Sequence, residues 1–137
     1  MRNKLIAGIS IFILISVVAV VLLNTNKTLA ELDEIPGEDS ILSASVTSTE
    51  HYTQEESYLY TLSDDELKEL IRIFSDQEVN RSFFNNAYSS EYTLTLQTAA
   101  ELNLIYISND NLYMENANNF YEMKSGELYS FIAALNQ

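Results

Sequence analysis

The stretch Tyr58 to Phe74, YLYTLSDDELKELIRIF, predicts a strand followed by a helix and so decides the fold class. Its first part, YLYTL, is rich in the aromatic and β-branched residues that suit a pleated strand. Ser63 is suited to cap the helix, because its hydroxyl can accept from a free backbone N–H while Glu66 reaches back to complete a capping box. Four apolar residues then follow at helical spacing and form one stripe that faces a core: Leu67, Leu70, Ile71 and Phe74.

More strands and a second helix are predicted after this stretch. Alternating apolar and polar residues predict an antiparallel meander of strands at 92–97, 102–107 and 112–115. A short strand at 120–123 leads to a last helix from about Ser125. The stripe of that helix repeats the earlier spacing with Leu128, Phe131, Ile132 and Leu135.

The chain before Tyr58 contains a strand and a polar segment. Residues 42–47 alternate between apolar and small polar side chains, which predicts a half-buried strand. Residues 24–40 carry five acids and the only proline, beside a glycine in Pro36-Gly37, so they are predicted to be an acidic linker. The folded domain is therefore expected to cover residues 41–137.

Near the N-terminus, the uncharged run LIAGISIFILISVVAVVLL covers residues 5–23. A spanning helix needs about 20 mostly apolar residues, so the run predicts a membrane anchor at 1–23 that contacts the lipid bilayer. Arg2 and Lys4 precede it, and the positive-inside rule then places the N-terminus in the cytoplasm and the C-terminal domain outside. The alternative is secretion after cleavage near Ala30, because small residues stand at the two positions that a signal peptidase reads.

These features together predict an α+β chain. It begins with an N-terminal transmembrane helix and continues as a small, mainly antiparallel sheet with two amphipathic helices packed on one face. The predicted organisation is an anchor at 1–23, a linker at 24–40 and one extracytoplasmic domain at 41–137. A chain of 137 residues leaves room for a single modest core beyond the anchor.

The charge of the chain restricts its partners. All 20 acidic residues follow Leu23 but only five basic ones do, so the part beyond the anchor carries a formal charge of −15. Such a surface repels nucleic acid and anionic lipid. Cysteine is absent, which excludes disulfides and thiolate metal sites.

No motif in the sequence supports catalysis. His51 is the only histidine and stands in a polar stretch, and no serine motif accompanies it to build a triad. The acids Asp64, Asp65, Glu66 and Glu69 gather at a helix start, where the helix dipole favours negative charge. A calcium loop from Asp76 would need a glycine and a closing glutamate that the chain lacks. No enzyme activity, metal or small-molecule cofactor is therefore predicted.

One predicted loop contains candidate residues for contact with a partner. Asn80 to Ser90 is predicted to be a loop by composition, and it contains Phe83, Phe84 and Tyr88. Exposed aromatic residues mark contact sites, so these three residues are candidates for contact with an unknown protein partner. The alternative is that Phe83 and Phe84 fold down to close one end of the core.

The order of these elements resembles a known kind of protein. The basic N-terminus, the apolar run, the acidic linker and the segments YTLTL, LNLIYIS, LYMEN and FYEMKSGELYSFIAAL are similar to small single-span exported proteins of low-GC Gram-positive bacteria that carry a domain of unknown function. A weaker likeness is to exported modules proposed as peptidase inhibitors, although the hairpin glycine usual there is missing between Gln97 and Leu102. The resemblance implies no catalytic residues.

Two functions follow as expectations. The first is a membrane-anchored extracytoplasmic protein that acts as a non-catalytic interaction module, through its sheet or through the loop at 83–88. The second is an exported inhibitor or immunity factor, whose acidic surface would imitate an anionic substrate or meet a basic partner. A hydrolase is the least supported reading, because the chain offers no nucleophile with a matching base.

Overall fold

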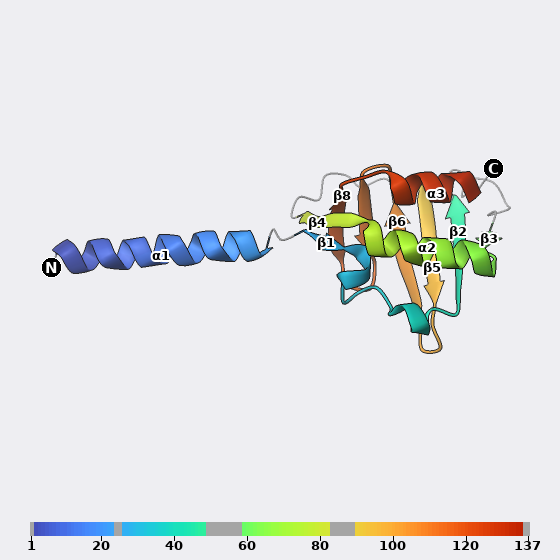
Figure 1. Cartoon of the computed structure of the whole chain (residues 1–137), viewed down its shortest axis with the longest axis horizontal. Helices are drawn as coiled ribbons and strands as arrows, with labels where there is room; N and C mark the ends of the chain where they lie inside the picture. The colour runs from blue at the N-terminus through green and yellow to red at the C-terminus, as the bar shows by residue number, and fades with distance from the viewer. Residues whose placement is uncertain (1, 24–25, 49–58, 83–89, 136–137) are drawn as a thin grey trace.

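The computed structural model describes residues 2–23, 26–48, 59–82 and 90–135. These residues form three α-helices and one eight-stranded sheet (Figure 1). The helices are α1 (Arg2–Leu23), α2 (Asp64–Asp76) and α3 (Glu127–Leu135). The strands are β1 (Lys27–Thr28), β2 (Ser43–Ser48), β3 (Leu59–Thr61), β4 (Glu78–Ser82), β5 (Tyr92–Gln97), β6 (Leu102–Ile107), β7 (Asn111–Met114) and β8 (Asn119–Met123). Two 3-10 turns, η1 (Leu29–Glu31) and η2 (Glu38–Ser40), lie between β1 and β2.

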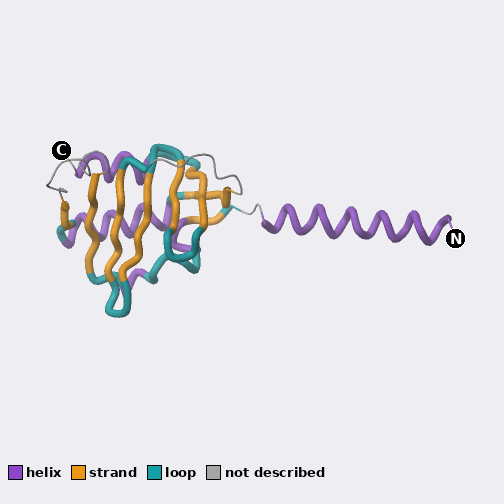
Figure 2. The backbone as a smooth tube through the Cα atoms, turned by 180° about the vertical axis from the view of Figure 1, so that it is seen from behind, coloured by secondary structure: helices purple, strands orange, loops and turns teal. Residues whose placement is uncertain are grey.

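The sheet is antiparallel at every pair of neighbouring strands. Its order is β1-β4-β8-β7-β6-β5-β2-β3, in which β5 to β8 form a meander. Both α2 and α3 lie on one face of this sheet, in front of it in Figure 1 and behind it in Figure 2. In the described part of the chain, no helix covers the opposite face.

The core lies between the sheet and these two helices. Side chains that point toward the helices from the central strands are almost fully buried: Val46, Leu94, Leu96, Ile105, Ile107 and Leu112. From the helices, Leu70, Leu128 and Ile132 meet them with no exposed surface. Each of these side chains contributes about 1.5–3 kcal/mol by leaving water, so this one layer supplies much of the stability of the domain.

The predicted cap of α2 is present, but its buried stripe is shifted. Ser63 Oγ accepts from the Glu66 backbone N–H at 3.4 Å, and the Ser63 N–H donates to Glu66 Oε2 at 2.8 Å. The fully buried side chains are Leu70, Ile73 and Phe74, whereas the predicted Leu67 and Ile71 are only half-buried. The buried face of α2 is shifted because both η1 and α3 pack against the helix.

Residues 26–40 differ from the predicted linker, because they are packed against the domain. Leu29, Leu32 and Ile35 are at most 7% exposed, and β1 pairs with β4 at one edge of the sheet. The Leu29 N–H also donates to the Gln77 carbonyl at 3.0 Å. The acids between these leucine and isoleucine residues hid their apolar spacing in the sequence. The folded body therefore begins before residue 41.

The predicted loop at 80–90 is wrong at its start, because residues 80–82 belong to strand β4. Residues 78–82 show one buried apolar side chain, Val79, and no apolar alternation. They are nonetheless paired with β8 over four residues and with β1 over two. Pairing on both sides thus formed a strand that local composition does not favour.

The prediction of a transmembrane helix is also corrected. Helix α1 has 22 residues, and its side chains are described for residues 4–20, all of them exposed. Among the described residues, no helix combines the length and the apolar character that crossing a membrane requires. The predicted fold class, which began with such a helix, is therefore corrected to three helices with an antiparallel eight-stranded sheet.

Candidate interaction surfaces

The face of the sheet opposite α2 and α3 is the first candidate surface, here called the open face. Residues that lie directly opposite one another in an antiparallel sheet point to the same side, so the strand register identifies its members. One unbroken row crosses seven strands: Leu59, Thr47, Thr93, Tyr106, Tyr113, Phe120 and Ser82. A shorter parallel row consists of Thr61, Ser45, Thr95 and Leu104.

The open face is uncharged over most of its width. Between β3 and β7, none of the described strand residues that point to this side is Asp, Glu, Lys or Arg. The first charged strand residue in this direction is Glu122, on β8, while Glu115, just after β7, accepts from the hydroxyl of the open-face residue Tyr106. The whole chain carries a formal charge of −13, so its acids are concentrated elsewhere.

Three aromatic rings line half of the open face. The ring centroids of Tyr106 and Tyr113 are 5.9 Å apart, and Tyr113 stacks on Phe120 at 4.5 Å with 27° between the ring planes. Hydrogen bonds hold both tyrosine rings in place. The Tyr106 hydroxyl donates to Glu115 at 3.1 Å, and the Tyr113 hydroxyl donates to Asn118 at 3.0 Å. The rings therefore form a fixed ridge across three strands.

The other half of the open face carries short hydroxyl side chains. Serine and threonine residues occupy it on β2, β3 and β5, and Leu59 at its margin is 61% exposed. Leu102, on β6, is 58% exposed on the same side. A neutral surface of this kind can bury apolar area and exchange hydrogen bonds with another neutral surface, without charged groups to desolvate.

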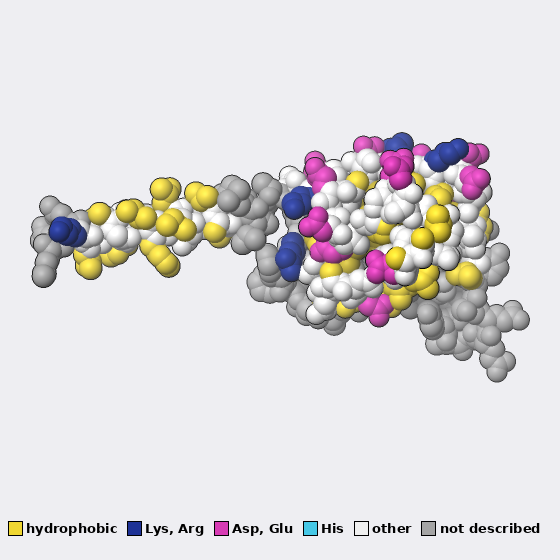
Figure 3. Space-filling view, turned by 90° about the horizontal axis from the view of Figure 1, so that it is seen from below, with side chains coloured by type: hydrophobic (Ala, Val, Ile, Leu, Met, Phe, Trp, Pro, Cys, Tyr) yellow, Lys and Arg dark blue, Asp and Glu magenta, His cyan; other side chains and the backbone are white. Residues whose placement is uncertain are grey.

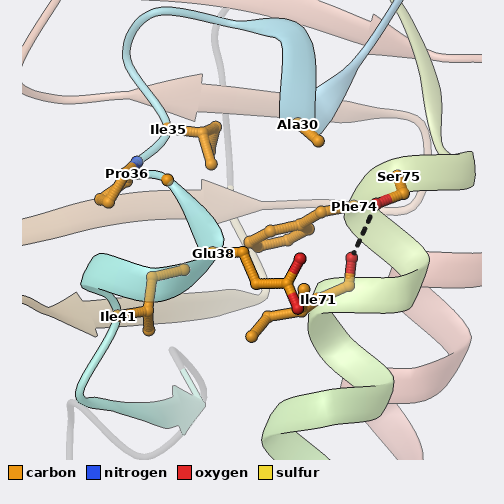
Figure 4. A pocket seen from close by; sticks show the side chains of 9 residues that line it. Ala30, Ile35, Pro36, Glu38, Ile41, Ile71, Phe74 and Ser75 are labelled. Carbon is orange, nitrogen blue, oxygen red and sulfur yellow. Dashed lines mark hydrogen bonds between the residues drawn. The ribbon is translucent and has the colours of Figure 1, made fainter.

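A small pocket on the helix side is the second candidate surface (Figure 4). It lies between the segment that carries η1 and η2 and one side of α2, and its volume is about 60 Å³. Buried apolar side chains from both elements form its floor, namely Ile35, Ile41 and Phe74. Ala30, Pro36, Gly37, Glu38, Ile71 and Ser75 complete its lining.

Glu38 supplies the charge at this pocket. Its side chain is exposed and reaches over the pocket toward Ile71 and Phe74 (Figure 4). Within the described ranges, no residue donates a hydrogen bond to its carboxylate or forms an ion pair with it. The Ser75 hydroxyl, by contrast, donates to the Ile71 carbonyl at 3.3 Å, as the dashed line shows.

A polar cluster joins the segment before η2 to the edge of the sheet. Glu34 accepts hydrogen bonds from Asn119 Nδ2 at 2.5 Å and from the Tyr121 hydroxyl at 2.9 Å, while Arg81 donates to Asn119 Oδ1 at 2.6 Å. Burial works against ionisation of Glu34, but hydrogen bonds from its own backbone, Tyr121 and Asn119, with the Arg81 charge, bring its pKa below 4.5. Burial and the neighbouring Glu34 raise the pKa of Tyr121 to about 12. Glu34 is therefore an ionised carboxylate, and its hydrogen bonds to Asn119 and Tyr121 hold the segment before η2 against the sheet.

Three of the four acids at the start of α2, Asp65, Glu66 and Glu69, have structural partners. Glu66 completes the cap and also accepts from the Tyr60 hydroxyl at 2.8 Å. Glu69 pairs with Arg72 at 2.8 Å, and the same guanidinium reaches Glu127 on α3 at 2.7 Å. Of the His, Cys, Asp and Glu side chains that are described, no three lie close enough to hold a metal ion.

The structure does not describe the residues predicted for partner contact. Phe83, Phe84 and Tyr88, like His51, fall outside the described residues, so that prediction is not tested. The sequence predicted contact through the sheet but did not identify the residues of the open face, although a pattern pointed to them. In the predicted strands at 42–47, 92–97 and 102–107, the residues that alternate with the core positions are uncharged in an otherwise acidic chain, as at Thr93 and Thr95.

Comparison with known proteins finds no relative of this chain. The chain matches no protein family, and neither a curated protein nor a solved structure is detectably similar to it. The likeness to small exported proteins of Gram-positive bacteria therefore stays a prediction from the sequence.

Proposed function

We propose that this protein is a non-catalytic interaction module that binds another protein through its open face. The observation that carries the proposal is the lack of charge at the open-face positions of β3, β2, β5, β6 and β7 in a chain of formal charge −13. Acids make up 20 of the 114 residues that follow Leu23, so a random placement would put about two of them at these positions. The centres of protein interfaces are likewise depleted in charge and enriched in tyrosine and phenylalanine.

The partner inferred from this face is itself neutral at the point of contact. An interface over Thr95 and Tyr113 would desolvate hydroxyl groups and aromatic rings, which can be matched by neutral hydrogen-bonding groups. A charge in the same place would be left without a counter-ion, at a cost of about 3–5 kcal/mol when one partner of a buried pair is missing. A charged substitution on the open face is therefore expected to abolish binding.

Site-specific crosslinking in the native cells tests the proposal. A photo-crosslinking amino acid at Thr95 should give a discrete adduct with one protein, identified by mass spectrometry. The same amino acid at Ser130, which is exposed on α3 on the other side of the sheet, is the positional control. Adding Ser45→Arg, directly opposite Thr95, should remove the adduct, whereas adding Ser130→Arg should leave it. No adduct from position 95, or one that survives Ser45→Arg, would refute the open face as the binding surface.

A second candidate is an exported inhibitor or immunity factor. It is favoured by the formal charge of −15 beyond Leu23, which suits a basic partner and fast association steered by charge. The two candidates differ in their ligand: the interaction module should be recovered in a stable complex from its own cell, and the inhibitor should bind a soluble secreted toxin or hydrolase. Raising the salt concentration should weaken only the second kind of complex strongly.

The location of the protein stays a prediction from the sequence, with the C-terminal domain outside the cell and release after cleavage near Ala30 as the alternative. Fractionation and proteolysis of cells stripped of their wall test both. A full-length chain that sediments with membranes and is cleaved by external protease supports the first. A shortened chain that begins at Glu31 in the medium supports the second.

A further inference from the structure

We infer that the pocket beside α2 receives a basic side chain, lysine or arginine, presented by a partner protein. This inference concerns the helix side of the sheet and goes beyond the proposed binding at the open face. It rests on the size of the pocket, the chemistry of its floor and the position of Glu38.

The size of the pocket limits its occupant to part of a side chain. A volume of about 60 Å³ corresponds to on the order of four water molecules. Sites for cofactors and metabolites are several-fold larger, typically about 300–1,000 Å³. A chain of three or four methylene groups fits this space, whereas a nucleotide or a flavin does not.

The floor of the pocket is apolar and already formed. Phe74, Ile35 and Ile41 are 2%, 7% and 8% exposed, so their side chains are held by the core beneath them. They come from two elements that are tied together, since Leu29 in η1 is hydrogen-bonded to the carbonyl of Gln77 just after α2. An occupant therefore loses little free energy to rearrangement of the pocket.

The rim selects for positive charge. Glu38 extends over the apolar floor, and the part of the chain described by the structure offers its carboxylate no cation (Figure 4). Lys68, a basic residue on α2, lies 3.6 Å from Asp65 instead. A purely apolar occupant would bury part of the Glu38 carboxylate without compensation. A lysine or arginine side chain lays its methylene stem on the floor and keeps its charged head at the carboxylate.

The overall acidity of the domain points in the same direction. Figure 3 shows acidic side chains spread over the domain and few basic ones among the residues drawn in colour. A basic segment of a partner would be attracted to this surface before any side chain enters the pocket. The pocket then gives that attraction a defined point of contact.

The test uses isoleucine methyl NMR on the full-length chain, held in a nonionic detergent because α1 exposes apolar side chains. The probes are acetylated, amidated tripeptides of alanine with a central lysine, arginine or norleucine, the last being an uncharged match for the lysine stem. We expect the lysine and arginine peptides to shift the methyl signals of Ile35, Ile41 and Ile71 saturably. The norleucine peptide should bind about two- to fivefold more weakly, the range of one exposed ion pair.

Two matched variants make the test specific. Glu38→Gln should weaken the basic peptides by the same factor, whereas Asp39→Asn removes a neighbouring charge that does not line the pocket and should leave the affinity unchanged. Ala30→Trp, at the exposed rim, should fill the entrance and abolish the shifts without disturbing the core. Equal affinity for norleucine, equal effects of both charge variants, or shifts that persist with Ala30→Trp would each overturn the inference. None of these results depends on the open face, so the two proposals can fail separately.

Discussion

Gln77 is a fully buried polar residue between α2 and α3. Its amide oxygen accepts from the Leu128 backbone N–H at 3.4 Å and from Ser125 Oγ at 3.3 Å, and its Nε2 donates to the Glu78 carbonyl at 3.1 Å. The first N–H groups of a helix have no partner inside the helix, so Gln77 caps the start of α3 from a distant part of the chain.

Replacing Gln77 by methionine tests this role, because the volume is kept while the hydrogen bonds are lost. The buried groups left without partners predict a loss of about 1–3 kcal/mol in the free energy of unfolding, measured with urea. Hydrogen exchange should also rise first at the N-terminal turn of α3. The matched change Gln97→Met, at an exposed position on β5, should cost much less. Equal losses for the two variants would show that the Gln77 contacts do not matter.

Glu34 predicts how stability depends on pH. Because its pKa is lowered in the folded state, its contribution is fully present above the unfolded value of 4.5 and is lost as the pH falls through the folded value. Urea unfolding from neutral pH down to about pH 3 should show a smaller loss of stability for Glu34→Gln than for the unchanged chain. Glu101→Gln, in the exposed turn before β6, is the control. If Glu34→Gln follows the unchanged curve, the carboxylate does not act through its ionised form.

At the scale of elements, α2 joins the parts of the domain. Its first turn is tied to β3 through Tyr60 and Glu66, and its last turns meet η1. Arg72 connects it to α3, since one guanidinium contacts Glu69, Asp76 and Glu127 within 2.8 Å. Loss of the start of this helix should therefore be felt across the core.

Ser63→Ala tests the cap of α2. Removing the hydroxyl leaves a backbone N–H of the first turn without its acceptor, and the expected loss in the free energy of unfolding is about 0.5–2 kcal/mol. Ser75→Ala, an exposed change in the last turn, serves as the comparison and should stay within a few tenths of a kcal/mol, because alanine is favourable in helices. Thermal or urea unfolding followed by circular dichroism measures both. A cost for Ser75→Ala equal to that for Ser63→Ala would argue against a special role for the cap.

For the whole molecule, the boundary of the folded body follows from burial. The segment that holds Leu29, Leu32 and Ile35 covers the edge of the sheet and one side of α2, whereas α1 extends away from the sheet in Figures 1 and 2. The body therefore begins close to β1.

Two truncations test this boundary. A chain that begins at residue 26 should fold with the stability of the full-length domain. A chain that begins at residue 41 loses three buried side chains of about 1.5–3 kcal/mol each, a large part of the roughly 5–15 kcal/mol that stabilises a domain, and should be largely unfolded. Circular dichroism and the dispersion of NMR signals distinguish the two states. A well-folded chain from residue 41 would show that residues 26–40 are a linker, as the sequence predicted.

The sequence by itself determined the elements that depend on near neighbours along the chain. The cap at Ser63, the apolar stripes and the alternation within β5, β6 and β7 arise from residues a few positions apart, so they could be read without knowing the fold. The lack of charge at the open-face positions of these three strands was equally present in the sequence.

Only the tertiary structure decided what depends on residues far apart. β4 is a strand because Thr28 and Met123 bring partners to its two sides, and the buried face of α2 is shifted because η1 and α3 pack against it. The open face joins Leu59 to Ser82 across seven strands, and the pocket joins Glu38 to Phe74. Such surfaces arise from contacts whose pairing is set by the packing of the whole core, which no local pattern encodes.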